Sequence, residues 1–310
     1  TLDRWAAVER HLPGYPPILF ELVRRELSLP THPAVVDVGC GTGRASLAMA
    51  RLGWRVTAVD PDEAALEVLR ARADAEALEI TALSVTAEAT HLDSASVDVV
   101  TAAHAFHWFD GPAALAEMTR IIRPGGGVAL FWNVREPARS PFLAAYHDLL
   151  DRYRVEKGLY VEASRASRAA GRALRRAPGL GAPVRHEVRN ELVRRPADFV
   201  EMAFRASFIR AFKTEVQAKF RADLTELLDL YGYTGRATFI IPNRIDCWIA
   251  RRTRHNNRGD RDHGRGPATR APAAPPLTPP ETSKPILEPL TVSGRQRAQP
   301  AQPAVSITEA

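Results

Sequence analysis

Residues 35–43 read VVDVGCGTG and are the most informative stretch of the chain. An apolar run that is closed by glycines predicts a strand that is buried on both faces and turns sharply into a helix. Glycine suits such a turn because it tolerates positive φ and lets a ligand approach the backbone. We therefore expect a strand at 34–38, a helix from Arg44 to about Leu52, and a ligand facing the loop between them.

A second apolar run, residues 55–60, ends in Asp60. An acid at the end of the second strand, about 20 residues after a glycine loop, can accept hydrogen bonds from both hydroxyls of a ribose. The two runs together predict a ligand that contains a nucleoside.

The spacing of the glycines distinguishes between ligands. A dinucleotide loop reads G-x-G-x-x-G, whereas Gly39, Gly41 and Gly43 form G-x-G-x-G, preceded by Asp37. An acid in this position is poorly placed beside a diphosphate, but it suits a ligand with an ammonium and a sulfonium group. The spacing speaks against an NAD(P)-dependent oxidoreductase, and it leaves open a glycine turn with a purely structural role.

Later segments extend the pattern. The chain resembles the class I S-adenosylmethionine-dependent methyltransferases, whose first motif has the form of residues 35–43, and segments resembling their later motifs follow in order at 58–62, 86–88, 97–110 and 121–133. Within this class, HAFHWF at 104–109 and PGYP at 13–16 are similar to the methyltransferase type 11 family. That family includes the ubiquinone and menaquinone C-methyltransferases and trans-aconitate O-methyltransferase.

The resemblance implies S-adenosyl-L-methionine as cofactor, no metal, and a small-molecule methyl acceptor. Asp60 would accept the ribose hydroxyls, Ala87 and Glu88 would hold the adenine, and the backbone at Ala103 would lie near the reacting methyl. Asp37 would orient the loop or the ammonium group. The implied cofactor residues are Asp37, Gly39, Cys40, Gly41, Gly43, Asp60, Pro61, Ala87, Glu88 and Ala103. A protein that binds the cofactor without using it is the alternative function.

Two histidines are the candidate catalytic residues. His107 could act as a general base toward a hydroxyl acceptor, because imidazole titrates near neutrality, or it could be a packing residue beside Trp108. His104 has the same two interpretations. A carboxylate acceptor would need no base and would instead need a cation, for which Arg135 is a candidate. The aromatic residues Trp108, Phe109 and Trp132 could line an acceptor pocket or belong to the core.

The alternation of apolar runs and helical periods predicts an α/β fold. We expect a Rossmann-like, doubly wound, seven-stranded sheet that is mostly parallel, with an antiparallel last strand and helices on both faces. The expected strands are 34–38, 55–60, 79–85, 97–102, 127–132, 184–193 and 237–249, where Pro242 implies an edge position or a break. Two late helices are expected at 198–212 and 214–230.

We expect one methyltransferase domain at 1–252, with its core at 33–133 and a lid and last strands at 141–252. Residues 253–310 hold 10 of the 24 prolines and almost no aromatic residue, which predicts a disordered tail. Its partner, if it has one, is unknown. The chain begins at Thr1 rather than at a methionine, which leaves room for further N-terminal residues before it.

Charge and composition narrow the function classes. The net charge of +6 is spread over body and tail, with eight Lys or Arg against five Asp or Glu from residue 254 on, so we expect no nucleic-acid partner. No apolar stretch is long enough to span a membrane. The two cysteines, Cys40 and Cys247, have no disulfide or metal-ligand spacing, and we expect a cytoplasmic protein.

Overall fold

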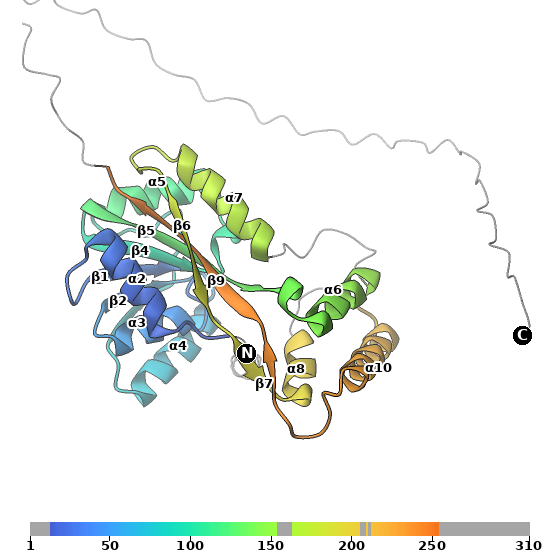
Figure 1. The fold of residues 1–310 in the computed structure, drawn as a ribbon. Coiled ribbons are helices and arrows are strands. Elements are labelled where there is room, and N and C mark those ends of the chain that lie inside the picture. The colour runs from blue at the N-terminus through green and yellow to red at the C-terminus, as the bar shows by residue number, and fades with distance from the viewer. Residues whose placement is uncertain (1–12, 154–162, 205–208, 210–211, 254–310) are drawn as a thin grey trace, which may run out of the picture. The chain divides into compact units, whose positions relative to one another are not determined.

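A seven-stranded sheet with helices on both faces forms the body of the protein (Figure 1). The computed structural model describes residues 13–153, 163–204, 209 and 212–253, all within the unit Thr1–Asn257. The strand order is β3-β2-β1-β4-β5-β9-β6. The strands are β1 (Ala34–Val38), β2 (Arg55–Val59), β3 (Ile80–Leu83), β4 (Val97–Ala103), β5 (Ile122–Arg135), β6 (Val184–Arg189) and β9 (Asn243–Arg251).

The predicted fold class is confirmed. Strands β1 to β5 pair in parallel, and β9 runs antiparallel to both of its neighbours, β5 and β6. The order reverses at β1, where the chain crosses to β4 on the other side, and ligands of open α/β sheets bind at such a switch point. The glycine loop follows β1 and therefore lies at this point.

Helices cover the two faces of the sheet in different groups. Along β5, Ala129 and Phe131 pack into the cluster that includes α2 and α3, whereas Leu130 and Trp132 pack into the cluster with α5 and α7. This alternation is the period of two that every strand imposes. The helices are α2 (Pro17–Leu27), α3 (Arg44–Arg51), α4 (Glu63–Ala75), α5 (Gly111–Ile121), α6 (Pro141–Tyr153), α7 (Ala163–Arg176), α8 (Pro196–Ala203) and α10 (Thr214–Leu230).

Local caps explain where α4 and α5 begin. The Asp62 carboxylate accepts a hydrogen bond from Ala64 N at 3.0 Å at the start of α4, and the Asp110 carboxylate accepts one from Ala113 N at 3.1 Å at the start of α5. Asx caps of this kind satisfy amides that have no partner within the helix. They fix both helix starts beside the loops that carry the predicted site.

The structure corrects several expected boundaries. β3 is shorter than 79–85, and β5 begins at Ile122 rather than at 127, because residues 123–126 form an irregularity within the strand. Pro242 is a break, since it separates β8 (Phe239–Ile241) from β9, and the expected strand 184–193 divides into β6 and β7 (Leu192–Arg194). The helix expected at 198–212 spans Pro196–Ala203, and residues 205–208 and 210–211 lie outside the described residues.

A second apolar core lies beside the end of the sheet, in the region predicted as a lid. It is formed by α6, α8 and α10 together with the two-stranded sheet of β7 and β8 (Figure 1). Phe142 is its centre, with ring contacts to Tyr146, Phe199, Tyr231 and others at centroid distances of 5.1–6.4 Å. The aromatic and aliphatic residues of this region therefore form a core that is separate from the core of the large sheet.

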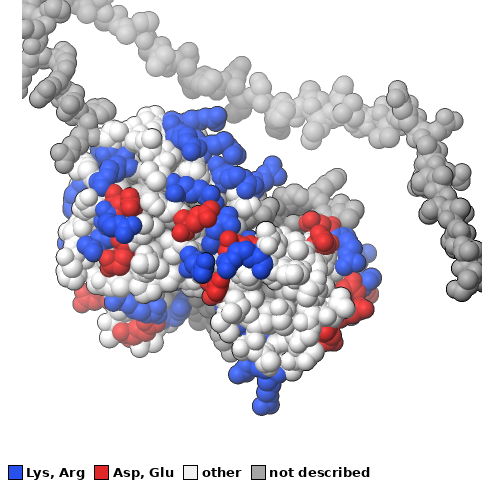
Figure 2. Space-filling model, viewed as in Figure 1, with Lys and Arg blue, Asp and Glu red and all other residues white. Residues whose placement is uncertain are grey.

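The surface carries both charges, as Figure 2 shows for one face. The outer face of α7 bears five exposed arginines, Arg165, Arg168, Arg172, Arg175 and Arg176. Among the described residues, no helix has the length and apolar character needed to cross a bilayer. The predicted tail lies outside the described residues except for its first residue, Thr253, and the domain boundary at 252 stays a prediction.

Candidate functional site

The predicted glycine loop forms a tight turn at the carboxyl end of β1. Gly39, Gly41 and Gly43 all adopt positive φ, at 65°, 54° and 80°. The amides of Gly39 and Cys40 donate hydrogen bonds to the carbonyl of Val59 at 2.7 and 3.1 Å, which joins the loop to the end of β2. The conformation explains why glycine occupies every second position here.

The three glycines differ in what surrounds them. A Cβ at Gly39 would lie 2.6 Å from Cβ of Ala105, and one at Gly43 would lie 2.1 Å from Cδ1 of Leu69. A Cβ at Gly41 would meet no described atom within 4 Å. Gly39 and Gly43 are therefore required by close packing, whereas Gly41 leaves space beside the loop that no described residue fills.

Asp60 holds the loop from the end of β2. Its Oδ2 accepts a hydrogen bond from Gly41 N at 2.8 Å, and its Oδ1 accepts one from Asp62 N at 2.9 Å. Each carboxylate oxygen keeps a second acceptor position. The structure thus brings Asp60 and Gly41 together after β2 and β1. Pro61 follows at the exposed start of the turn into α4.

Asp37 lies below the loop rather than on its surface. The residue is fully buried, and its carboxylate accepts hydrogen bonds from Ser46 Oγ at 2.6 Å and Thr101 Oγ1 at 2.8 Å. Burial raises the pKa of Asp37 to about 6, although the two hydroxyls oppose this shift. Asp37 therefore ties β1 to α3 and β4, and it can orient the loop from beneath.

Sequence reasoning missed Ser46 and Thr101. The signal that could have found Thr101 is a hydroxyl residue inside the apolar run of β4, because a buried hydroxyl needs a partner. Cys40, next to Gly41 in the loop, is half-buried, and burial raises the pKa of its thiol well above the ordinary value. It is a packing residue of the loop rather than a reactive thiolate.

The predicted adenine residues follow β3. Ala87 is buried, and Glu88 is half-buried with its Oε1 accepting a hydrogen bond from Asp110 N at 3.0 Å. This bond connects the segment after β3 to the segment after β4. The second carboxylate oxygen of Glu88 has no hydrogen bond to another described residue.

The segment after β4 departs from regular geometry at His104. This residue has a φ of 57°, which is uncommon for any residue other than glycine, and its amide donates to the carbonyl of Phe131 at 2.8 Å. Strained residues of this kind cluster at functional sites. The predicted residue Ala103 precedes it as the last residue of β4, half-buried at the same edge of the sheet.

His104 and His107 lie together, with ring centroids 5.6 Å apart. The buried indole of Trp132 donates a hydrogen bond from Nε1 to Nδ1 of His107 at 3.4 Å. Burial lowers the pKa of His107. Desolvation within the surrounding protein also lowers the pKa of His104, and its basic neighbours His107, Arg44 and Arg135 lower it further. His104 itself is exposed to solvent.

One cation and two tyrosines complete the surroundings. Arg135, the last residue of β5, lies with its Cζ 5.5 Å from the ring centroid of Tyr146 on α6. Tyr15 is buried against Phe131, and burial raises its pKa to about 12 although its hydrogen bond with Asn133 opposes the shift. Asn133 also accepts hydrogen bonds from the side chains of Asn190 and Asn243.

The three candidate aromatic residues have different positions. Trp132 is fully buried in the main core, Phe109 packs partly against that core and against Gly39, and Trp108 is 75% exposed. The core interpretation therefore holds for Trp132. Trp108 is the one of the three that presents a large apolar surface to solvent.

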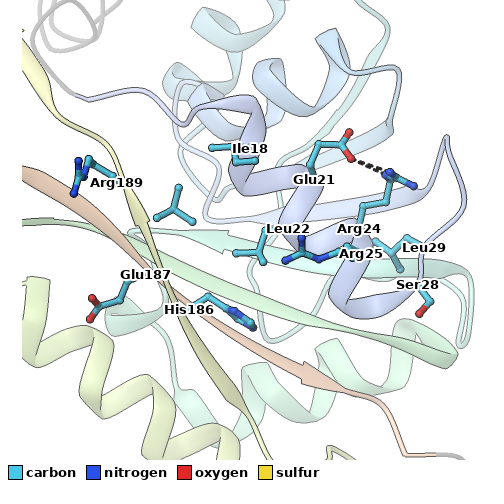
Figure 3. A pocket seen from close by; sticks show the side chains of 11 residues that line it. Ile18, Glu21, Leu22, Arg24, Arg25, Ser28, Leu29, His186, Glu187 and Arg189 are labelled. Carbon is cyan, nitrogen blue, oxygen red and sulfur yellow. Dashed lines mark hydrogen bonds and ion pairs between the residues drawn. The ribbon is translucent and has the colours of Figure 1, made fainter.

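A groove of about 850 Å³ lies elsewhere, between α2 and the edge strand β6 (Figure 3). Charged side chains from both elements line it, among them Glu21, Arg24, Glu187 and Arg189. Glu21 and Arg24 pair with each other at 2.8 Å. None of the predicted cofactor or acceptor residues lines this groove, so it is separate from the site at the glycine loop.

Comparison with known proteins agrees with this geometry. The methyltransferase domain family matches residues 36–130. An uncharacterized methyltransferase of Mycobacterium tuberculosis is 40% identical over 131 residues, which cover 42% of this chain and 50% of that protein. A ubiquinone biosynthesis O-methyltransferase of Methylocella silvestris is 37% identical over 93 residues, covering 30% and 36% of the two chains.

The chain thus spans about half the length of the Mycobacterium relative and about a third of the length of the Methylocella relative. Among solved structures, one assigned as a type II methyltransferase from Anaeromyxobacter dehalogenans superimposes with a TM-score of 0.54 and 28% identity. That comparison covers 78% of this chain and 97% of the other. The sheet order is that of the class I methyltransferase fold, and residues 36–130, which include the glycine loop and its Asp60 partner, are similar to the methyltransferase domain family.

Proposed function

We propose that the protein transfers a methyl group from S-adenosylmethionine to a small-molecule acceptor. One observation carries the proposal: the open face of Gly41 at the switch point of the sheet, with the amide of this glycine bonded to Asp60. Backbone without a side chain allows the homocysteine part of this co-substrate to approach closely, and the adjacent carboxylate suits its ribose. The family match of residues 36–130 supports the same conclusion.

The residues fit the proposed ligand in four places. The glycine loop would receive the amino-acid end, and Asp60 would accept the ribose hydroxyls through its remaining acceptor positions. The amide of Ala87 and the free oxygen of Glu88 would hold the edge of the adenine ring. Ala103 and His104 would lie near the methyl group. Asp37 would act from beneath by fixing α3 and β4.

The bound co-substrate supplies a methyl carbon that its sulfonium has already activated. The residues of the chain therefore contribute position and orientation, which alone can account for a large share of a rate enhancement. A carboxylate, a hydroxyl or an activated carbon could serve as acceptor in such a displacement. The histidines and Arg135 lie on the side of the site where that choice is made.

Binding and turnover test the proposal separately. Calorimetry should show that the full chain binds S-adenosylmethionine and S-adenosylhomocysteine and does not bind NAD. Radioactive methyl transfer to a pool of small molecules should then require the same protein. Binding of NAD instead would contradict the assignment, and binding of the methyl donor without turnover would leave a protein that only holds it.

A further inference from the structure

We propose that the acceptor is a carboxylate, which the guanidinium of Arg135 and the Nε2–H of His107 receive beside the methyl group. This inference rests on the proposed function, because it names the substrate class of the same site. Three features of the described residues lead to it: the protonation of His107, the charges around His104, and the pairing of the arginines near Arg135.

The partner of His107 determines which of its nitrogens carries a proton. Trp132 donates to Nδ1, and an indole nitrogen can only donate. A neutral imidazole that accepts at Nδ1 carries its proton at Nε2. Nε2 is therefore a donor that already carries its proton, and Nδ1 could take a proton from a hydroxyl only by giving up its bond with Trp132.

His104 is equally unsuited to proton removal. Its pKa is lowered by desolvation and by three neighbouring groups, His107, Arg44 and Arg135, all of them basic. A base works best when its pKa lies near the working pH, so a lowered pKa makes His104 a weak base. The charges of Arg44 and Arg135 create a positive local potential, which favours an anion.

Arg135 differs from the nearby arginines in its pairing. Arg139 is paired with Glu136 and Glu191, and Arg244 is paired with Glu136 and Asp246. Within the described ranges, Arg135 forms no ion pair with an acid and contacts the ring of Tyr146 instead. Its guanidinium is thus held by an aromatic face while its hydrogen-bond donors remain available, and a guanidinium binds a carboxylate through two parallel hydrogen bonds.

These features decide between the acceptor classes. A hydroxyl or an activated carbon must lose a proton in the course of its methylation, and neither histidine is suited to take it. A carboxylic acid, with an ordinary pKa near 4, is already ionised at neutral pH. It needs cations and donors for orientation, and those are the groups that surround this part of the site.

The reaction balances without any further reagent. A lone pair of the carboxylate oxygen forms the new bond to the methyl carbon, and the electron pair of the carbon–sulfur bond passes to sulfur. The products are a methyl ester and a neutral thioether, S-adenosylhomocysteine, and no proton moves. Arg135 and His107 hold the oxygen that does not react or direct the one that does.

The chemistry of methyl esters supplies a direct test. The full chain is incubated with S-[methyl-³H]adenosylmethionine and either a protein-free bacterial small-molecule extract or a panel of carboxylic acids with their matched primary alcohols. Base hydrolyses methyl esters and releases volatile [³H]methanol, whereas methyl ethers, methylamines and C-methyl products keep the label. We expect the product label to be base-labile, and the alcohols of the panel to remain unlabelled.

Two variants assign the effect to Arg135. Arg135→Met should raise the KM for a carboxylate substrate about 10- to 100-fold, and Arg135→Lys should recover part of this loss. Arg189→Met, on exposed strand β6 in the separate groove, is the matched control and should behave as wild type. The Kd for S-adenosylhomocysteine, measured by calorimetry, should be the same in all four proteins.

The outcomes separate the two proposals. If the chain binds neither S-adenosylmethionine nor S-adenosylhomocysteine, the proposed function itself fails. If it binds them and the label is base-stable, if no base-labile product forms, or if Arg135→Met leaves the KM unchanged, the carboxylate proposal is overturned while the proposed function survives.

Discussion

The indole of Trp132 and the imidazole of His107 share a hydrogen bond of 3.4 Å, in which Trp132 Nε1 donates to His107 Nδ1. Trp132 is on β5 and His107 is in the short helix Phe106–Trp108 after β4, so the bond crosses from one strand end to the next. Because Trp132 is fully buried, its donor has little access to water, and this gives His107 a fixed role.

This relationship predicts that His107→Gln stays active. Glutamine can accept from Trp132 through its carbonyl oxygen and donate through its amide, but it cannot act as a base. We expect kcat to stay within about tenfold of wild type, whereas loss of a true general base costs about 10²- to 10⁴-fold. His107→Ala, which removes both bonds, should lose more activity than His107→Gln. Equal and severe losses in both variants would show that His107 is a base.

Asp60→Ala should weaken binding of the methyl donor. The variant removes acceptors for the ribose and also releases the amide of Gly41, and a hydrogen bond to a charged group contributes about 1.5 to 3 kcal/mol. Asp62→Ala is the matched control. It removes the cap of α4 and should cost about 1 kcal/mol of stability without a comparable change in affinity. Calorimetry with S-adenosylhomocysteine and urea unfolding of both variants measure the two effects, and equal affinities would refute the role of Asp60.

The glycines of the loop should respond differently to an added methyl group. Gly41→Ala should fold, with a cost of about 1 kcal/mol for a left-handed residue, and lose affinity because its Cβ enters the open space. Gly39→Ala should be destabilised more strongly, because its Cβ would collide with Ala105 and Phe109. Thermal unfolding and ligand titration distinguish the two. Full affinity in Gly41→Ala would place the ligand elsewhere.

Asp37 should make stability depend on pH. Its folded-state pKa of about 6 is raised above the ordinary 3.8, so the folded state holds the proton more tightly than the unfolded state. The resulting stabilisation is present below pH 4 and is lost as the pH rises through 6, a difference of about 3 kcal/mol. Asp37→Asn does not titrate there. The free energy of unfolding of Asp37→Asn minus that of wild type should therefore increase by about 2 kcal/mol between pH 4 and pH 7. A pH-independent difference would contradict this assignment.

Much of the site could be predicted because its signals are local. A few consecutive residues determine the turn at 39–43, and the same holds for the acid that follows β2, Asp60. Parallel pairing of β1 with β2 then brings Gly41 and Asp60 together. The caps at Asp62 and Asp110 are local for the same reason.

The remainder depends on contacts between distant residues. The bond from Thr101 to Asp37 spans 64 positions, and the bond from Trp132 to His107 spans 25. No periodicity in the sequence encodes such pairs. The insertion of β9 between β5 and β6 is likewise a matter of tertiary packing, since an apolar strand at the end of the chain could equally lie at an edge.

The central claim is that the loop at Gly39–Gly43 binds a methyl donor, and calorimetric titration of the full chain tests it most directly. We predict micromolar binding of S-adenosylhomocysteine and S-adenosylmethionine to wild type, a strong loss in Gly41→Ala, and no heat with NAD. Absence of binding to both sulfur compounds in a folded protein would contradict the account.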